Sequence, residues 1–148
     1  MSQETTHSLV TALRAVPDFA SIDDHTLLRI VGASANLLYA KGERIFERGD
    51  PSEALYVLLS GTVHVFDEGD DGEDVIDEIE AGRSFGEFSL LLETTHSKSA
   101  EVVEDAEILV LPAGSFRRLL DDSPDLAEYF RRRIQEQKRI RGEVSEPA

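Results

Sequence analysis

Residues 54–66 read ALYVLLSGTVHVF and decide the fold class. An apolar run at 54–59 is followed by the turn residues Ser60-Gly61 and then by a run at 62–66 in which polar and apolar residues alternate. Such short runs, separated by turn residues, are typical of β-strands. Similar runs occur at 43–46, 75–79 and 107–111, with glycine or proline between them. We therefore predict a mainly β protein, a small barrel or jelly roll that extends over residues 37–111.

Helical periodicity appears on both sides of this β region. Leucines and valines recur at three- and four-residue steps within 8–38, with a break at Pro17, and Ser21 with Asp24 forms a candidate capping box for the second helix. Beyond the β region, Ser123-Pro124 is the expected opening of a longer helix. We predict one domain with helices at 1–36 and 112–141 and a flexible tail at 142–148.

The composition excludes several kinds of protein. The chain has 148 residues, no cysteine and four histidines that are far apart in the sequence. Disulfides, thiolate nucleophiles and cysteine-type zinc sites are therefore absent, and no histidine spacing suits a metal or a Ser–His–Asp set. No run approaches the eighteen apolar residues of a membrane span. We expect a cytoplasmic protein that is not an enzyme and holds no metal.

Charge is distributed unevenly along the chain. The net charge is −15; residues 67–80 hold nine acidic residues and no basic one, whereas residues 117–141 hold eight of the fifteen basic residues. Most of such a surface repels a phosphate polyanion, which argues against direct nucleic-acid binding. The residues after 141 are also too few for a helix-turn-helix.

The most informative candidate site lies at residues 85–89, Phe-Gly-Glu-Phe-Ser, with Lys98-Ser99-Ala100 after a polar loop. Gly86 allows the backbone to approach a ligand closely, and an apolar run that begins at Phe88 can open a short helix whose N–H groups face an anion. The Glu87 carboxylate accepts hydrogen bonds, as sugar hydroxyls require, and Lys98 supplies a positive charge. These groups suit a ribose phosphate.

Residues 17–141 resemble the cyclic nucleotide-binding domains of catabolite activators, protein kinase A regulatory subunits and cyclic-nucleotide-gated channels. The resemblance is carried by residues 42–46, 49–50 and 55–61, by 85–87, and by Ser99-Ala100 leading into Val102. It implies a double-stranded β-helix, or β-roll, flanked by helices, with a phosphate-binding cassette at 85–102. The ligand would be cyclic AMP or cyclic GMP, with no further cofactor.

The resemblance also implies roles for individual residues. Glu87 would accept a hydrogen bond from the ribose 2′-hydroxyl, next to Phe85. Gly86 and the backbone of Phe88 and Ser89 would surround the sugar and the cyclic phosphate. Ser99, beside Ala100, would add a hydroxyl contact, and the C-terminal helix around Ile134 would cover the base.

Two departures from the family pattern bear on ligand affinity. Lys98 stands where the family has an arginine if the alignment is anchored on Ser99-Ala100, and counting forward from Phe85 with the shortest common loop places His96 there instead. Lysine lacks the bidentate fork of arginine, and the loss of one charged hydrogen bond weakens binding by about ten- to a hundred-fold. Glu101 adds a carboxylate near the expected phosphate.

Two functions therefore stay open at this level. The first is a stand-alone sensor that binds a cyclic nucleotide weakly and signals by moving its C-terminal helix against the roll or an effector protein of unknown identity. The second is a degenerate roll that binds no nucleotide and serves as a protein-interaction module. The 124–141 helix is a candidate homodimer contact in either case, and a cupin-type metal enzyme ranks third.

Overall fold

The computed structural model describes residues 3–20, 22–69, 72–92 and 94–144. Its helices and strands follow one another along the chain as α1 (Gln3–Arg14), η1 (Pro17–Phe19), α2 (Asp24–Ala33), β1 (Ala35–Tyr39), β2 (Arg44–Phe46), β3 (Ala54–Gly69), β4 (Gly72–Glu80), β5 (Arg83–Phe85), α3 (Glu87–Leu91), β6 (Ser99–Pro112), α4 (Ala113–Asp122) and α5 (Pro124–Val144).

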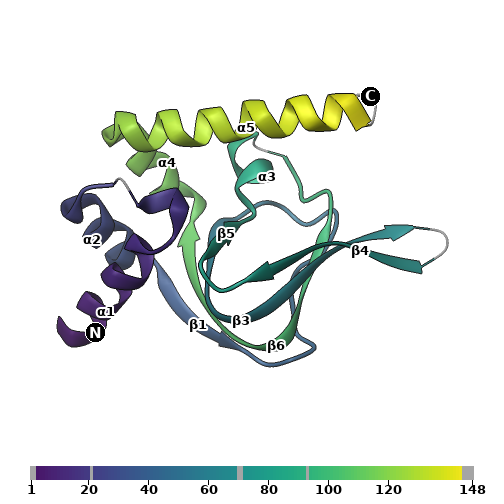
Figure 1. Cartoon of the computed structure of the whole chain (residues 1–148), viewed down its shortest axis with the longest axis horizontal. Helices are drawn as coiled ribbons and strands as arrows, with labels where there is room; N and C mark the ends of the chain where they lie inside the picture. Colours follow the sequence, from purple (N-terminus) through teal and green to yellow (C-terminus); the bar gives the residue numbers. More distant parts are fainter. Residues whose placement is uncertain (1–2, 21, 70–71, 93, 145–148) are drawn as a thin grey trace.

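The strands form one curved antiparallel sheet in the order β1-β6-β3-β4, with β2 also paired to β6 and β5 also paired to β3 (Figure 1). The two longest strands, β3 and β6, pair along almost their whole length, from Ala54 opposite Pro112 to Phe66 opposite Ser99. Helices lie outside this roll, and α5 runs across its top above α3. This arrangement confirms the predicted mainly β fold with flanking helices.

The structure corrects the predicted turn at Ser60-Gly61. Residues 54–59 and 62–66 belong to the single strand β3, whose register with β6 shifts around Ser60 and Thr62. Gly61 has a φ of +92°, and a Cβ there would lie 2.4 Å from the backbone oxygen of Asp105. The glycine is needed because two strands approach closely at an irregularity, and it does not end the strand.

The described residues of the acidic stretch, 67–69 and 72–80, lie in a hairpin formed by β3 and β4. Gly69 pairs with Gly72 at its tip, and Asp67 faces Asp74 across the two strands. The hairpin projects to one side of the roll in Figure 1.

Two apolar clusters form the core. The first joins the helices to one part of the sheet, and in it the Phe130 ring of α5 packs edge-on against Phe116 of α4, with 5.1 Å between ring centroids. The second fills the roll and includes Phe46, Tyr56 and Phe85. Burial of such large side chains fixes α5 against the rest of the domain.

Helix ends differ from the predictions in two places. Asp23 caps α2, because its carboxylate accepts a hydrogen bond from the Thr26 N–H at 3.1 Å, while the predicted capping residue Ser21 lies outside the described residues. At the other end, α5 continues to Val144, so the helix ends three residues later than predicted; residues 145–148 lie outside the described part, and the flexible tail stays a prediction. Within the described residues, no helix is both long and apolar enough to cross a membrane.

Candidate functional site

The first half of the cassette is a sharp connection between β5 and α3. Gly86 has a φ of +85°, and a Cβ at this position would lie 3.0 Å from the Tyr56 ring. Phe85 stacks on that same ring, with centroids 5.2 Å apart. Glycine therefore lets the chain turn against a packed aromatic pair, and Glu87 becomes the first residue of α3.

The helix after this turn is short. It contains five residues, little more than one turn, so the predicted anion contact at its N-terminus rests on few N–H groups. Phe88 and Ser89 contribute their backbone to α3, whereas their side chains lie outside the described ones. Their predicted place around the sugar and phosphate stays a prediction.

The cassette carboxylate has a partner that the sequence did not reveal. Glu87 has a side chain only 6% exposed, and its Oε1 accepts a hydrogen bond from Nη2 of Arg133 on α5 at 2.8 Å. The same guanidinium donates through Nη1 to the Oγ of the buried Ser84 at 3.3 Å. The cassette and the C-terminal helix are thus joined by a charge-assisted pair that is largely shielded from water.

A signal for Arg133 was present in the sequence. The residue follows Leu126 by seven positions and Phe130 by three, which places it on the buried stripe of its helix. An arginine on such a stripe needs a carboxylate or other acceptor nearby. The run of three arginines conceals this, because a run of like charges is typical of a solvated face.

The second half of the cassette starts β6. Lys98, the predicted phosphate cation, makes an ion pair with Asp67 of β3, with 3.2 Å between Nζ and Oδ2. The Ser99 hydroxyl is buried and accepts the Arg48 N–H at 2.9 Å, and Ala100 is fully buried beside Phe46. Lys98 is thus engaged by the acidic hairpin, and its role at a phosphate stays a prediction.

His96, the other candidate for the arginine position, lies inside the roll. Its ring stacks on Phe46 with 3.7 Å between centroids, and its backbone N–H donates a hydrogen bond to the backbone oxygen of Asp50 at 2.9 Å. Burial lowers the pKa of His96, against the opposing effect of Asp50 and Glu53. The imidazole is therefore neutral at pH 7 and supplies no cation to a phosphate.

The Glu101 carboxylate is neutralised within the sheet. Its Oε1 accepts a hydrogen bond from Nε of Arg44 at 3.1 Å, and the Arg44 guanidinium also lies 4.5 Å from the Phe66 ring centroid. The pair reduces the repulsion that the sequence suggested between Glu101 and an anion.

Ile134, the predicted cover of the base, follows Arg133 on α5 and is mostly buried. The structure thus joins residues 84–87 to α5 and places Lys98 on the hairpin side. Across residues 3–20, 22–69, 72–92 and 94–144, no three metal-ligating side chains come together as a metal site requires.

Comparisons with known proteins agree with this architecture. Residues 37–123 match the cyclic nucleotide-binding domain family. The cyclic AMP receptor protein of Thermus thermophilus is 38% identical over 104 residues, 67% of this chain and 48% of that protein. Lysophospholipase NTE1 of Chaetomium globosum is 36% identical over 86 residues, 57% of this chain and 6% of that protein. The chain thus spans half or less of the length of these curated relatives.

Among solved structures, the sensor domain of the transcriptional regulator DNR from Pseudomonas aeruginosa superposes with a TM-score of 0.86 over 98% of both chains, at 20% identity. At this identity the likeness shows the fold alone. The family match extends over more than half of the 148 residues and includes the whole cassette. The chain therefore belongs to the cyclic nucleotide-binding domain family.

Proposed function

We propose that this domain is a sensor in which a cyclic nucleotide binds Glu87 through its ribose hydroxyl and Arg133 passes the binding event to α5. The observation that carries the proposal is the 2.8 Å hydrogen bond between the Arg133 guanidinium and Glu87 Oε1. It links the residue expected to hold the sugar with the helix expected to move.

A carboxylate can serve both partners. Its two oxygens offer about four acceptor sites, so Glu87 can accept a sugar hydroxyl in addition to Arg133 and its further contact. A ligand that contacts both the cassette and α5 favours the arrangement in which the helix is docked, and the signal is the resulting shift in population. The ligand can act only to the extent that it binds this arrangement more tightly than the undocked one.

The contacts of the residues expected to bind the phosphate lead us to expect a weak affinity for cyclic nucleotides. Lys98 Nζ lies 3.2 Å from Asp67, so a cyclic phosphate has to share this ammonium with a carboxylate or displace that carboxylate. The Ser99 hydroxyl lies next to Lys98 in the chain and accepts the Arg48 N–H at 2.9 Å. We expect Ser99 to contribute to phosphate binding and Lys98 to contribute less than the arginine of the family.

Calorimetric titration tests ligand binding directly. The full chain is titrated with cyclic AMP, cyclic GMP and cyclic dinucleotides, and we expect saturable heat from a cyclic mononucleotide. Glu87→Gln should weaken binding by about ten- to a hundred-fold, since it removes a charged acceptor. Glu136→Gln makes the same chemical change on an exposed part of α5 and should leave binding unchanged. No heat with any ligand at about 1 mM refutes the sensor proposal.

Movement of α5 needs a separate measurement, which the absence of cysteine simplifies. Lys41→Cys and Gln135→Cys place two spin labels at exposed positions, one on the roll and one on α5. We expect saturating cyclic nucleotide to change the distance distribution, Arg133→Ala to abolish that change, and Arg132→Ala to keep it. An unchanged distribution in a protein saturated with nucleotide rejects signalling through α5.

The second candidate is a degenerate roll that acts as a protein-interaction module. The engagement of Lys98 by Asp67 and the burial of a neutral His96 favour it. Lys98→Arg combined with Asp67→Asn restores a free arginine at the cassette. A functional pocket gains nucleotide affinity from these two substitutions, whereas a degenerate pocket still binds no nucleotide.

An effector protein or a second subunit would be the binding partner in either case. Leu126 and Phe130 of the helix at 124–141, the candidate homodimer contact, are fully buried within this chain. A homodimer through α5 would therefore have to use other faces of the helix. Sedimentation equilibrium with and without cyclic AMP tests this assembly.

A further inference from the structure

The strand β1 forms one end of the sheet and pairs with β6. In an antiparallel edge strand, alternate residues direct their N–H and C=O groups away from the partner strand. Proteins usually protect such edges with charged residues or proline, yet residues 35–39 read ANLLY and contain neither. Leu38 is moreover 82% exposed. This edge has the properties of a surface that accepts another strand.

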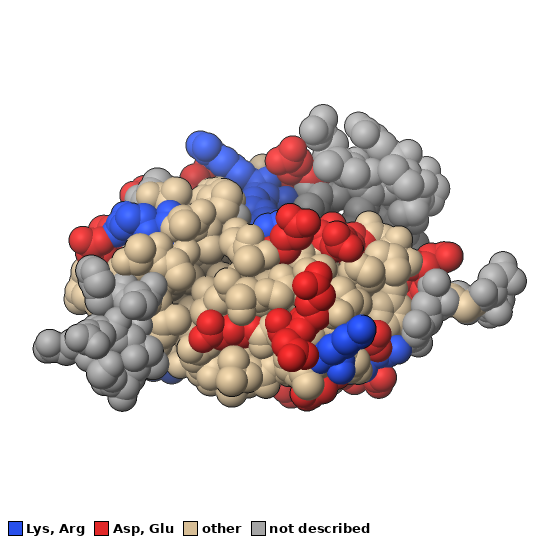
Figure 2. All heavy atoms as spheres, turned by 60° about the horizontal axis from the view of Figure 1, so that its bottom comes forward, with Lys and Arg blue, Asp and Glu red and all other residues tan. Residues whose placement is uncertain are grey.

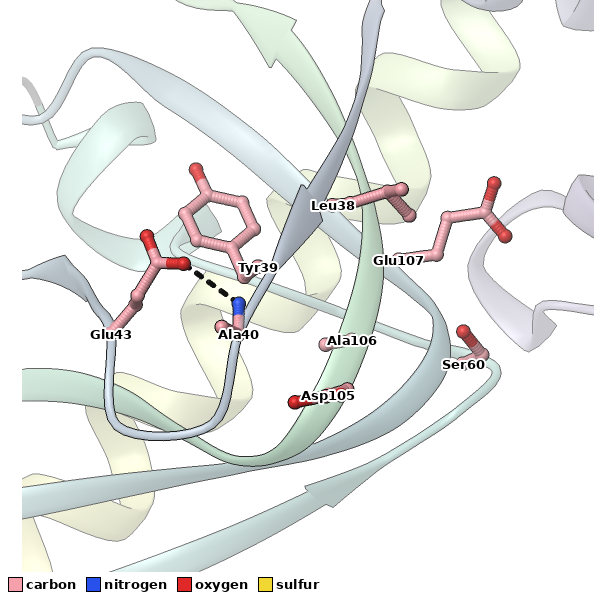
Figure 3. A pocket seen from close by; sticks show the side chains of 8 residues that line it. All are labelled: Leu38, Tyr39, Ala40, Glu43, Ser60, Asp105, Ala106 and Glu107. Carbon is pink, nitrogen blue, oxygen red and sulfur yellow. Dashed lines mark hydrogen bonds between the residues drawn. The ribbon is translucent and has the colours of Figure 1, made fainter.

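A hollow of about 520 Å³ lies beside β1. Figure 3 shows the side chains that line it, which include Leu38 and Tyr39 of β1 and Asp105, Ala106 and Glu107 of the paired strand β6. Leu38 lies directly opposite Glu107 in the β1–β6 register. An exposed aliphatic side chain thus borders a concave surface that has room for side chains of a partner.

Carboxylates surround this hollow. Glu43 Oε1 accepts the Ala40 N–H, Asp105 Oδ1 accepts the Lys41 N–H and Glu107 Oε2 accepts the Asn36 side-chain amide, each at 2.8 Å. Each of these bonds uses one oxygen, so each carboxylate keeps acceptor capacity for a further donor. Figure 2, which turns the lower side of Figure 1 forward, shows acidic side chains spread over an otherwise largely uncharged surface, with basic side chains at its margin.

We propose that β1 and this hollow bind an extended segment of a partner protein in which an aliphatic residue has lysine or arginine two positions before and two positions after it, so that all three side chains share the face of the sheet that carries Leu38 and Glu107. Main-chain hydrogen bonds to the β1 edge would supply affinity, an aliphatic side chain would cover Leu38, and the basic side chains would bind Glu43, Asp105 and Glu107. Polyanions are repelled by the same carboxylates, and a second β1 edge would bring like charges together.

This surface is independent of the nucleotide site. In Figure 1 the cassette helix α3 and the helix α5 lie at the top of the domain, whereas the lower end of β1 and the bend of β6 lie at the bottom of the roll. A partner on β1 can therefore bind whether or not a nucleotide occupies the cassette.

Fluorescence anisotropy with a fluorescein-labelled heptapeptide that has lysine at its second and sixth positions, leucine at its fourth and serine elsewhere tests the proposal on the full chain. We expect saturable binding that weakens with salt. Leu38→Asp is the decisive variant, because it adds a negative charge while it removes the aliphatic contact. Docking on β1 predicts about tenfold weaker binding, whereas simple attraction to an acidic protein predicts equal or tighter binding.

Two controls complete the design. Glu107→Lys should weaken binding more than Asp74→Lys, which makes the same charge change on the distant hairpin. A peptide with alternate amides N-methylated should bind more weakly, because it lacks donors for the edge. The proposal is overturned by an absence of saturable binding at about 1 mM peptide. Equal binding to Leu38→Asp, equal effects of the two lysine variants, or unchanged binding of the methylated peptide also overturns it.

Discussion

Replacing Arg133 with alanine removes the side chain that joins α5 to the cassette. The guanidinium donates to Glu87 at 2.8 Å and to Ser84 at 3.3 Å. The Glu87 side chain is 6% exposed and that of Arg133 is 24% exposed, so the pair is shielded from water on the cassette side more than on the helix side.

The magnitude follows from this burial. Breaking a fully buried ion pair costs about 3–5 kcal/mol, and one hydrogen bond to a charged group contributes about 1.5–3 kcal/mol. Arg133 is partly exposed and Glu87 makes a further interaction, so the loss of stability should lie in the lower of these two energy ranges. We expect Arg133→Ala to lower the free energy of unfolding by about 2 kcal/mol, or Tm by roughly 4–8 °C at this chain length.

Urea denaturation followed by circular dichroism measures the change, and Arg132→Ala is the matched control. Arg132 is the preceding residue of the same helix; its side chain is 75% exposed and pairs with Glu128 at 3.1 Å. Removing such a surface pair should cost less than about 1 kcal/mol. A double variant with Glu87→Gln should lose less than the sum of the two single losses. Equal losses for Arg133→Ala and Arg132→Ala would show that the pair does not hold α5.

Three further predictions concern the scaffold. Gly61→Ala should lower the free energy of unfolding by about 2–5 kcal/mol in urea titrations, because residue 61 has a left-handed backbone conformation and the new Cβ would also clash with backbone atoms. Gly42→Ala is the control: its φ is +95° but the space around it is open, so this variant should lose only about 1–2 kcal/mol. Asp23→Ala should cost about 1 kcal/mol by removing the cap of α2, and a thermal melt unchanged from wild type would reject that role. Burial holds the pKa of His96 below its ordinary value of 6.5. As the pH falls, the unfolded chain therefore binds the proton before the folded chain does. The free energy of unfolding thus decreases as the pH drops from about 7 to about 5. The urea midpoint of His96→Phe should therefore fall less than that of wild type between about pH 7 and pH 5, and equal declines would contradict the assignment.

The sequence predicted the parts of the fold in which local pattern and tertiary pairing agree. The runs at 54–59 and 62–66 were identified as extended, but the close approach of Gly61 to β6 is a long-range event, so one strand was divided into two. β1 was not identified as a strand, because its first residues fell within a segment with helical spacing and its leucines face solvent. A strand that is exposed along its length shows little alternation of apolar and polar residues, and this alternation is the signal by which strands are predicted from sequence.

The candidate site was predictable only in part for a similar reason. Residues 85–87 carry their chemistry in a short local motif, so they could be singled out. Arg133 lies 46 positions later, and its role exists only because α5 packs across the cassette. Lys98 shows the converse, since a cation at the position expected from the sequence is paired with Asp67 of the hairpin in the folded chain.

The pairing of β3 with β6 also determines how the domain must fold. β3 finds β4 immediately along the chain, but its partners on β6 lie roughly 30 to 60 residues away in sequence, and closing loops of that size is slow. The β3–β4 hairpin can form early, whereas the roll cannot close until residues 99–112 are available. We therefore expect refolding on the millisecond-to-second scale typical of non-local β topologies. During synthesis on the ribosome, β3 must wait unpaired on its β6 side until most of the chain has emerged.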